Sequence, residues 1–243
     1  MDWKLKIIMF GGEKTPTEIR RKIEEELSEG CKSFAGYGLS ETGGPPVANE
    51  CIYSREQEEM HIFADHVFPE IINSETGERV GPGEQGELVL TTLTREASPM
   101  IRWRTRDITS WAEKPLGCKC RRNALPKITP IVGRSDDMIK VRGTMFWPSQ
   151  VEDILSTIEG LNLEGWHIYL DTPREGLERI KVCAEATEQY WNREGRPELL
   201  KSKITSEISA RLGQSIDVEI CAPNSLPRYE RKAVRLIKAK EDQ

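Results

Sequence analysis

The sequence predicts two folded parts: an α/β domain with a β-rich subdomain over residues 1–132, and a small α+β domain over residues 138–243. Three observations support this prediction. An apolar run, a glycine turn and an amphipathic stretch follow one another near the N-terminus; short strand-like segments fill the middle; and a helix–strand–strand–helix–strand pattern fills the end. A length of 243 residues suits one large domain or two smaller ones.

The composition is that of a soluble globular protein, with 37% hydrophobic and 31% charged residues. The net charge of −5 argues against nucleic acid as a partner, and no apolar run approaches the roughly 20 residues of a membrane helix. The N-terminus does not have the pattern of a signal peptide, so we expect a cytoplasmic protein. The six cysteines are then expected to be thiols or metal ligands rather than disulfides.

The N-terminal segment is expected to form a strand, a turn, a helix and a second strand. Residues 5–10 (LKIIMF) are a continuous apolar run, which is typical of a strand buried on both faces. Thr15–Glu18 fits a capping box with proline at the first helical position, and apolar residues then recur every four positions from Ile19 to Leu27. A short strand is expected at residues 32–35.

Residues 62–111 are expected to be rich in β-structure. The segments HVFPEII, GELVLTTL and MIRWRTRDITSW have the β-branched and apolar content of strands, and the turn-rich run NSETGERVGPGEQG separates the first two. Residues 112–132 are irregular and include the sequence CKC.

The helical pattern restarts after a boundary that we place at residues 133–137. A helix is expected from Ser149, where Ser149 and Glu152 form a second S-x-x-E start, and another over residues 197–212. Strands are expected in WHIYL, RIKVCAEA and IDVEIC. This order favours helices on one face of an antiparallel sheet.

A glycine-rich stretch at residues 36–44 (GYGLSETGG) combines an aromatic ring, a hydroxyl and a carboxylate. Glycines let a backbone approach a ligand closely. A tyrosine can stack on a base, a serine hydroxyl can bond a phosphate oxygen, and a carboxylate can hold Mg²⁺. In isolation, however, such a stretch is more often a surface turn.

Three later stretches have charged residues that could act with this turn. Asp107 follows a run of three arginines and could accept hydrogen bonds from sugar hydroxyls, although a salt-bridged strand end is the ordinary explanation. GRSDDMIKVRG places Arg134 and Asp136 at the domain boundary, which alone fits a charged linker. Lys232 follows a turn near the C-terminus, where a lone lysine is usually solvated.

Together and in this order, the four stretches resemble the adenylate-forming (ANL) superfamily, and within it the phenylacetate–coenzyme A ligases. The resemblance covers nearly the whole chain and includes FGGE, GYGLSE, HIF-DH-FPEI and FWPSQVEDIL. Its most specific part is the pairing of GELVLTTLTREASPMIRWRTRD with GRSDDMIKVRG. It implies the C-terminal part of a large AMP-binding domain over residues 1–132, a hinge at 133–137 and a small lid domain over 138–243.

The resemblance implies an acid–thiol ligase. Such enzymes use ATP and Mg²⁺ to join a carboxylic acid, here an aryl or aryl-acetic acid, to AMP; they release pyrophosphate and transfer the acyl group to coenzyme A. By resemblance, Tyr37 would lie against the adenine, while Asp107 would bind the ribose hydroxyls with the help of Arg134. The implied nucleotide-binding set is Gly12, Glu13, Tyr37, Gly38, Asp107, Arg134 and Lys140.

The resemblance also implies the catalytic residues. Ser40 would contact the α-phosphate, Glu41 would hold Mg²⁺, and Lys232 would bridge the charge that develops between carboxylate and phosphate. Asp136 would be the hinge about which the lid domain rotates, presenting Lys232 for the first step and withdrawing it for the second.

Two departures from the family stand out. The position before Lys232 is usually glycine and here is Arg231, whose charge and bulk would alter how the lysine enters the site. The Ser/Thr/Gly-rich phosphate loop that ends in Gly-Lys, well before the GGE stretch in the family, has no counterpart here. We therefore expect the chain to be the C-terminal portion of a longer ligase and to lack full adenylation activity alone.

Cys51, His61, Cys118 and Cys120 could form a closed tetrahedral zinc site. The spacing is not that of a standard zinc finger, and unrelated thiols with a structural histidine are equally consistent with it. Some relatives in the family have cysteines and a histidine in these places, which favours a structural zinc. His66 is a weaker candidate ligand.

Two alternatives to the acid–thiol ligase remain open. Within the superfamily, a related class adenylates a deazaflavin cofactor and needs no coenzyme A, and the motifs do not separate the two. Outside enzymes, the chain could be a non-catalytic, zinc-stabilised half that acts with a separate N-terminal half or as a homodimer. A zinc-ribbon protein that binds nucleic acid is disfavoured by the negative net charge.

Overall fold

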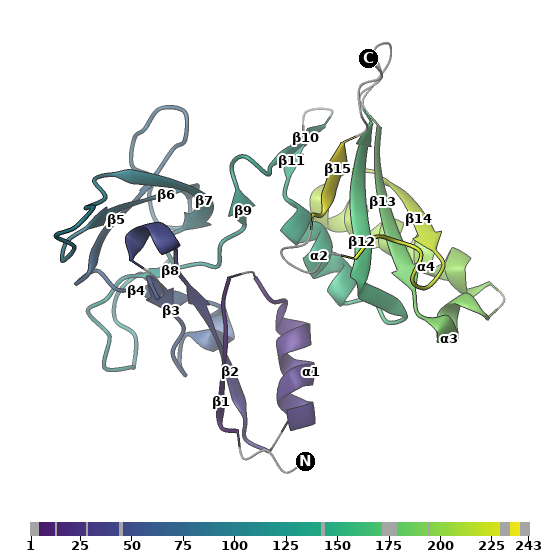
Figure 1. Ribbon diagram of the computed structural model, residues 1–243, viewed down its shortest axis with the longest axis horizontal. Helices are drawn as coiled ribbons and strands as arrows, with labels where there is room; N and C mark the ends of the chain where they lie inside the picture. The colour runs from purple at the N-terminus through teal and green to yellow at the C-terminus, as the bar shows by residue number, and fades with distance from the viewer. Residues whose placement is uncertain are drawn as a thin grey trace. The chain divides into compact units, whose positions relative to one another are not determined.

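The computed structural model describes residues 5–12, 14–27, 29–43, 46–141, 144–171, 179–193, 195–228 and 234–238. The chain divides into two compact units, residues 1–136 and 137–243 (Figure 1). Each unit has its own hydrophobic core. The division falls inside the segment 133–137.

The first unit begins with a parallel strand pair and a helix. Strand β1 (Ile7–Phe10), helix α1 (Thr17–Leu27) and strand β2 (Lys32–Tyr37) follow one another, and β1 pairs with β2 in parallel. Three short strands continue this sheet in antiparallel fashion, in the order β1-β2-β3-β4-β8: β3 (Ala48–Asn49), β4 (Met60–Ile62) and β8 (Lys127–Ile128). Two short 3₁₀ helices lie between these strands, η1 (Ser40–Thr42) and η2 (Arg55–Gln57).

Strand β1 lies at the edge of its sheet, and the prediction that both its faces are buried is wrong. The side chains of Ile7 and Met9 are 62% and 54% exposed, because β2 is the only described strand that pairs with β1. Helix α1 begins at Thr17, two residues later than Thr15 of the predicted capping box, where the amides of Ile19 and Arg20 donate to the Pro16 carbonyl.

A second, antiparallel sheet completes the first unit and confirms the predicted β-rich region. Its order is β5-β6-β7-β9, with bounds β5 (Val67–Ile72), β6 (Gln85–Thr92), β7 (Trp103–Ser110) and β9 (Gly133–Arg134). Alternate residues such as Leu88 and Leu90 on β6 pack into a core with Ile62 of β4, so that the core joins the two sheets.

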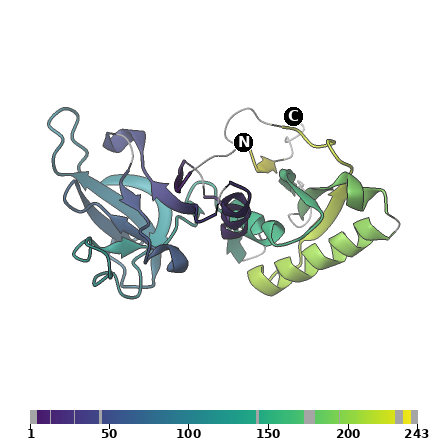
Figure 2. The ribbon, with the colours of Figure 1, turned by 90° about the horizontal axis from the view of Figure 1, so that it is seen from below.

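The second unit packs two helices, one of nine and one of 17 residues, on a four-stranded sheet (Figure 2). Its sheet order is β14-β13-β12-β15, and a two-stranded ribbon, β10–β11, precedes helix α2. The elements are β10 (Ile139–Val141), β11 (Thr144–Phe146), α2 (Pro148–Ser156), β12 (Leu161–Asp171), β13 (Arg179–Ala186), α3 (Glu188–Trp191), α4 (Arg196–Leu212), β14 (Asp217–Cys221) and β15 (Leu236–Lys238).

Two expectations for this unit need correction. The sheet is mixed rather than antiparallel: β12 and β13 are antiparallel, but β14 runs parallel to β13, because α4 is a crossover connection that returns the chain in the same direction. Helix α2 begins at Pro148, not Ser149, and the Trp147 amide donates to the Gln150 side chain at 3.0 Å. Glu152 instead accepts a 3.4 Å hydrogen bond from Arg235.

A buried carboxylate holds the segment between β14 and β15. Glu185 on β13 has no exposed side-chain surface. Its oxygens accept hydrogen bonds from the amides of Asn224 (3.2 Å) and Leu226 (2.7 Å) and from the guanidinium of Arg228 (2.5 Å). A single charged side chain therefore fixes residues 222–228 against the sheet.

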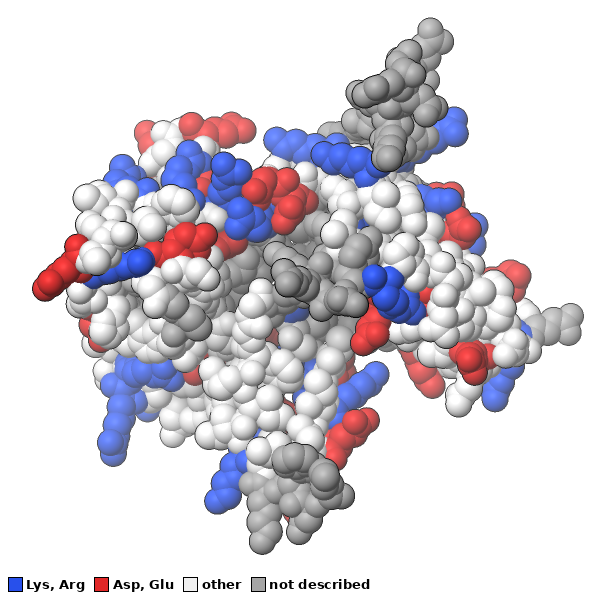
Figure 3. Space-filling view, in the orientation of Figure 1, with Lys and Arg blue, Asp and Glu red and all other residues white. Residues whose placement is uncertain are grey.

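The outer surface is charged but mixed. In the described part of the chain, basic and acidic side chains lie interspersed on the face drawn in Figure 3. None of the described helices is both long and apolar enough to cross a lipid bilayer.

Candidate nucleotide site and metal centre

Two glycine-rich turns meet at the carboxyl ends of the parallel strands β1 and β2. Phe10 is in register with Ala35, so the turns that follow both strands emerge at the same sheet edge, where open α/β sheets bind ligands. A Cβ added to Gly11 would lie 3.4 Å from the Gly36 carbonyl oxygen, and Gly12 has a φ of +87°. The left-handed turn at position 12 thus favours glycine, whereas a Cβ at position 11 would make only an ordinary van der Waals contact.

Tyr37 and Asp107 lie together at this edge although they are 70 positions apart in the sequence. The phenol of Tyr37 donates a 2.5 Å hydrogen bond to Oδ2 of Asp107, whose residue exposure is only 6%. Burial and the negative charge of Asp107 raise the pKa of Tyr37 far above its ordinary range. The phenol therefore keeps its proton at neutral pH and serves as a donor.

A β-bulge in β7 aims Asp107 towards Tyr37. The register between β6 and β7 shifts between Glu87 and Val89, and Arg106 there has a φ of +66°. The Arg106 amide donates to the Glu87 carboxylate at 3.2 Å. A bulge re-aims the side chains beside it. Sequence reasoning did not identify Arg106 as a functional residue. The one signal for it in the sequence is its position directly before Asp107.

Arg134 connects Asp107 with Asp136. Strand β9 pairs with β7 so that Arg134 is opposite Asp107, and Nη1 of Arg134 lies 3.9 Å from Oδ1 of Asp107. The same guanidinium donates to Asp136 at 2.9 and 3.1 Å, and Arg106 adds a 3.2 Å bond. Hydrogen bonds from Arg134, supported by Arg106, hold the pKa of Asp136 below its usual value. Asp136 is thus an ionised acceptor tied to the strand that presents Asp107.

We expect Arg106→Gly to raise the free energy of unfolding of the first unit by up to about 1 kcal/mol. The left-handed conformation costs a non-glycine residue about 1–2 kcal/mol, whereas the Arg106–Asp136 pair is exposed and worth about 0–1 kcal/mol. Denaturant unfolding would measure the difference. Arg106→Ala is the control, because it removes the ion pair but keeps the strained backbone. An Arg106→Gly protein less stable than the alanine variant would contradict this account.

The predicted phosphate and magnesium residues lie just beyond Tyr37. Ser40 and Glu41 are exposed residues of η1, which ends at Gly43 in the left-handed conformation (φ +99°). Arg95, from the loop after β6, donates a hydrogen bond to the Glu41 carbonyl. The turn is therefore attached to the second sheet.

Of the remaining predicted residues, the structure describes Gly38 and Lys140. Gly38 continues from β2, beside Tyr37. Lys140 is an exposed residue of β10 in the second unit. Glu13, Arg231 and Lys232 lie outside the described residues.

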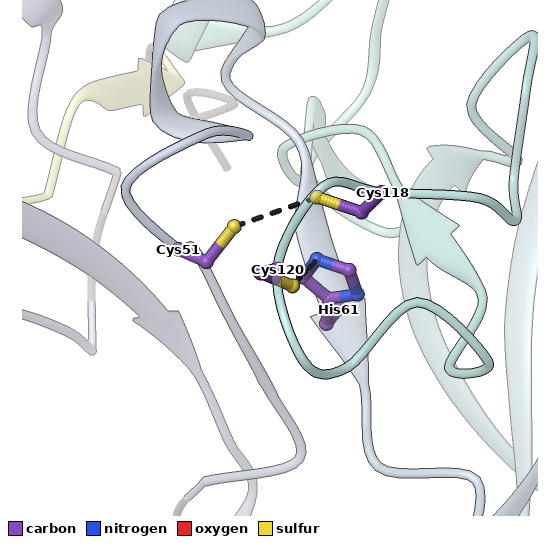
Figure 4. A group of neighbouring side chains, drawn as sticks. All are labelled: Cys51, His61, Cys118 and Cys120. Carbon is purple, nitrogen blue, oxygen red and sulfur yellow. Dashed lines mark hydrogen bonds between the residues drawn. The ribbon is translucent and has the colours of Figure 1, made fainter.

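The four predicted zinc ligands come together, as Figure 4 shows. Cys51 follows β3, His61 is on β4, and Cys118 and Cys120 belong to the loop between β7 and β8. Their ligand atoms all lie within 4.8 Å of one another. His66 lies elsewhere, exposed, with Nδ1 3.5 Å from Thr94 Oγ1.

The spacing of these atoms fits a tetrahedral ion. When each zinc–sulfur bond is about 2.3 Å, two sulfur ligands of a tetrahedral ion lie about 3.8 Å from each other. The Sγ atoms of Cys51 and Cys118 are 3.7 Å apart, and Nε2 of His61 is 3.3 Å from Sγ of Cys120. Nδ1 of His61 lies 3.3 Å from the Leu125 carbonyl, to which it can donate, leaving Nε2 as the ligand atom. Burial lowers the pKa of His61, so its imidazole is neutral at pH 7.

The chain is similar to known proteins over nearly its whole length. Residues 143–240 match the family "AMP-binding enzyme C-terminal domain". The chain is 38% identical over 233 residues to a phenylacetate–coenzyme A ligase of Pseudomonas putida, covering 96% of this chain and 50% of that protein. It is 37% identical over 235 residues to the Escherichia coli phenylacetate–coenzyme A ligase, covering 96% and 51%. The chain thus spans about half the length of these relatives.

Solved structures confirm the predicted fold class. A 2-hydroxyisobutyryl-CoA ligase in the postadenylation state, in complex with 2-HIB-AMP, superposes with a TM-score of 0.82 at 25% identity, covering 97% of this chain and 49% of that one. A benzoate CoA ligase from Burkholderia xenovorans has the same fold, with a TM-score of 0.65 at 19% identity, covering 92% and 43%. The chain is therefore similar, along nearly its whole length, to the C-terminal half of the phenylacetate–coenzyme A ligases, as its motifs indicated.

Proposed function

We propose that this chain supplies the nucleotide-binding half-site and the lid domain of an ATP-dependent acid–CoA ligase. In this reaction an aryl or aryl-acetic acid attacks the α-phosphorus of ATP, pyrophosphate leaves, and the acyl group of the resulting acyl-AMP passes to the thiol of coenzyme A. The observation that supports the proposal is the Tyr37–Asp107 hydrogen bond at the carboxyl ends of β1 and β2.

The residues fit the groups of an adenylate. The buried Asp107 carboxylate can accept hydrogen bonds from ribose hydroxyls, and the Arg134 guanidinium beside it balances its charge. The exposed oxygens of Ser40 and Glu41 are hard ligands of the kind that phosphate-bound Mg²⁺ takes. In the proposed reaction, Asp136 is the hinge and Lys232 approaches the α-phosphate during adenylation.

Calorimetry with a non-hydrolysable acyl-AMP mimic tests the proposal on this chain directly. We expect binding, and we expect Asp107→Asn to weaken it by about 10- to 100-fold, since hydrogen bonds to charged groups are worth about 1.5–3 kcal/mol. Asp217→Asn, at an exposed position of β14, is the matched control and should bind like the wild type. The proposal fails if the wild-type chain does not bind the mimic, or if Asp107→Asn binds it equally well.

The choice of coenzyme A as acceptor depends on the relatives. The curated relatives that match are named phenylacetate–coenzyme A ligases, which favours a thiol over a deazaflavin hydroxyl. Measuring AMP release with and without coenzyme A, in an assembly that has adenylation activity, separates the two.

We further propose that Cys51, His61, Cys118 and Cys120 bind a structural zinc ion. The ion would join the segment after β3 to the irregular loop between β7 and β8. The four protein ligands leave no open coordination position, so the zinc would stabilise the fold and take no part in the reaction. Cysteines that bind metal rather than form disulfides suit the cytoplasm, which we propose as the location of the protein.

A half-enzyme that acts with a partner is the second candidate. The exposed apolar side chains of Leu5, Ile7 and Met9 on and beside the edge strand β1 favour a further polypeptide at this edge. That partner would be equivalent to the remaining half of the relatives. In this case acyl-AMP formation by this chain requires the partner.

A further inference from the structure

A small polar cavity lies beside the η1 turn and is not used by the nucleotide residues described above. Its volume is about 160 Å³. Val47 and Phe63 line its apolar side, and Thr42, His66, Thr94 and Arg95 line its polar side. We call this space the Arg95 cavity. It is smaller than the roughly 300 Å³ of the smallest pockets for drug-sized ligands, so it suits a small ion or group rather than a whole nucleotide.

The donors around the Arg95 cavity favour an anion. Arg95 offers a guanidinium and Thr94 offers a hydroxyl, which lies 3.5 Å from the His66 ring. The hydroxyl of Thr42 already donates to the Leu39 carbonyl at 2.9 Å, so Thr42 lines the cavity without supplying a donor. Within the described ranges, no carboxylate forms an ion pair with Arg95; its described bond is to the Glu41 carbonyl. Arginine with hydroxyl donors is the usual recognition set for phosphate oxygens. Asp65 lies beside this ring, with Oδ2 3.7 Å from Nε2 of His66.

The cavity adjoins the place where the α-phosphate would lie. Thr42 belongs to the same 3₁₀ turn as Ser40 and Glu41, and Arg95 is hydrogen-bonded to that turn. When a carboxylate oxygen bonds to the α-phosphorus, the bond from the α-phosphorus to the bridging oxygen breaks, and its electron pair leaves with the β- and γ-phosphoryl groups as pyrophosphate. We propose that the Arg95 cavity is a subsite for this pyrophosphate, an inference that rests on the proposed function.

The test is calorimetry of this chain with sodium pyrophosphate and MgCl₂, with inorganic phosphate as a second probe. We expect pyrophosphate to bind more tightly than phosphate. Arg95→Gln should weaken it by about 10-fold or more, and Thr94→Val by about 2- to 10-fold, as expected for a charged and a neutral hydrogen bond. Both variants should bind the acyl-AMP mimic as the wild type does, which also shows that they are folded. Arg211→Gln, on the exposed surface of α4, is the matched control.

The possible outcomes separate this inference from the proposed function. Pyrophosphate binding that depends on Arg95 supports the subsite. Equal pyrophosphate binding by Arg95→Gln, or no pyrophosphate binding by a chain that still binds the acyl-AMP mimic, overturns the subsite and leaves the nucleotide half-site intact. A chain that binds neither compound overturns the proposed function and the subsite with it.

Discussion

Cys120→Ser is expected to abolish stoichiometric zinc binding. It should also make the first unit about 4 kcal/mol less stable than in the wild type, when the free zinc concentration is a thousand times the wild-type Kd. Serine is a poor zinc ligand, and the free energy of binding a structural metal is also free energy of folding. The effect should be large because the Cys118–Cys120 loop is irregular and attaches to β3 and β4 through these ligands.

Zinc content by mass spectrometry and thermal unfolding of the zinc-loaded chain would measure this. Wild type should contain one zinc ion per chain, and a chelator should lower its unfolding temperature to that of Cys120→Ser. Cys221→Ser is the matched control, since Cys221 lies on β14, outside the cluster. Full zinc occupancy in Cys120→Ser, or none in wild type after reconstitution, would rule out the metal centre.

Glu185→Gln should destabilise the second unit by about 3–5 kcal/mol at neutral pH, as expected when one partner of a buried ion pair is removed. Both oxygens of the carboxylate accept hydrogen bonds, from Arg228 and from the backbone N–H groups of Asn224 and Leu226. A glutamine side chain has one oxygen acceptor, and its NH₂ group would face these donors. Residues 222–228 would lose their attachment to β13. Hydrogen exchange of the backbone amides of β13, followed as denaturant is added, reports on this unit.

This effect should depend on pH in a defined direction. Burial disfavours the charged form of Glu185, but hydrogen bonds from Arg228 and the two amides outweigh it, so the folded-state pKa lies below the ordinary value of 4.5. A carboxyl group with a depressed pKa stabilises the fold above its unfolded pKa and loses that contribution as pH falls through the folded pKa. The difference between wild type and Glu185→Gln should therefore shrink below about pH 4.5. Glu188→Gln, exposed at the start of α3, should show neither effect; a pH-independent difference for Glu185→Gln would contradict the ion-pair explanation.

Most individual elements could be predicted from the sequence, because hydrophobic periodicity and turn residues are local properties. RIKVCAEA is β13, the stripe of apolar residues over 197–212 is α4, and the β-rich region has the expected strands. The family motifs also assigned Tyr37 and Asp107 to parts of one nucleotide, since a motif records an arrangement that related chains already adopt.

Pairing between distant segments could not be predicted in the same way. The direction of β14, the exposed edge at β1 and the bulge at Arg106 depend on which strands lie side by side. Likewise, the sequence left the zinc ligands open, because the spacing between Cys51 and Cys118 says nothing about a 3.7 Å separation of their sulfur atoms.

The sequence by itself determined the elements, the family resemblance and the residue types that can bind a nucleotide or a metal. Only the tertiary structure decided that Asp107 meets Tyr37, that four metal-binding side chains meet at one point, and that Arg95 reaches the η1 turn. The reason is physical: periodicity and turn chemistry act over a few residues, whereas these contacts join segments that packing and strand pairing bring together from far apart in the chain.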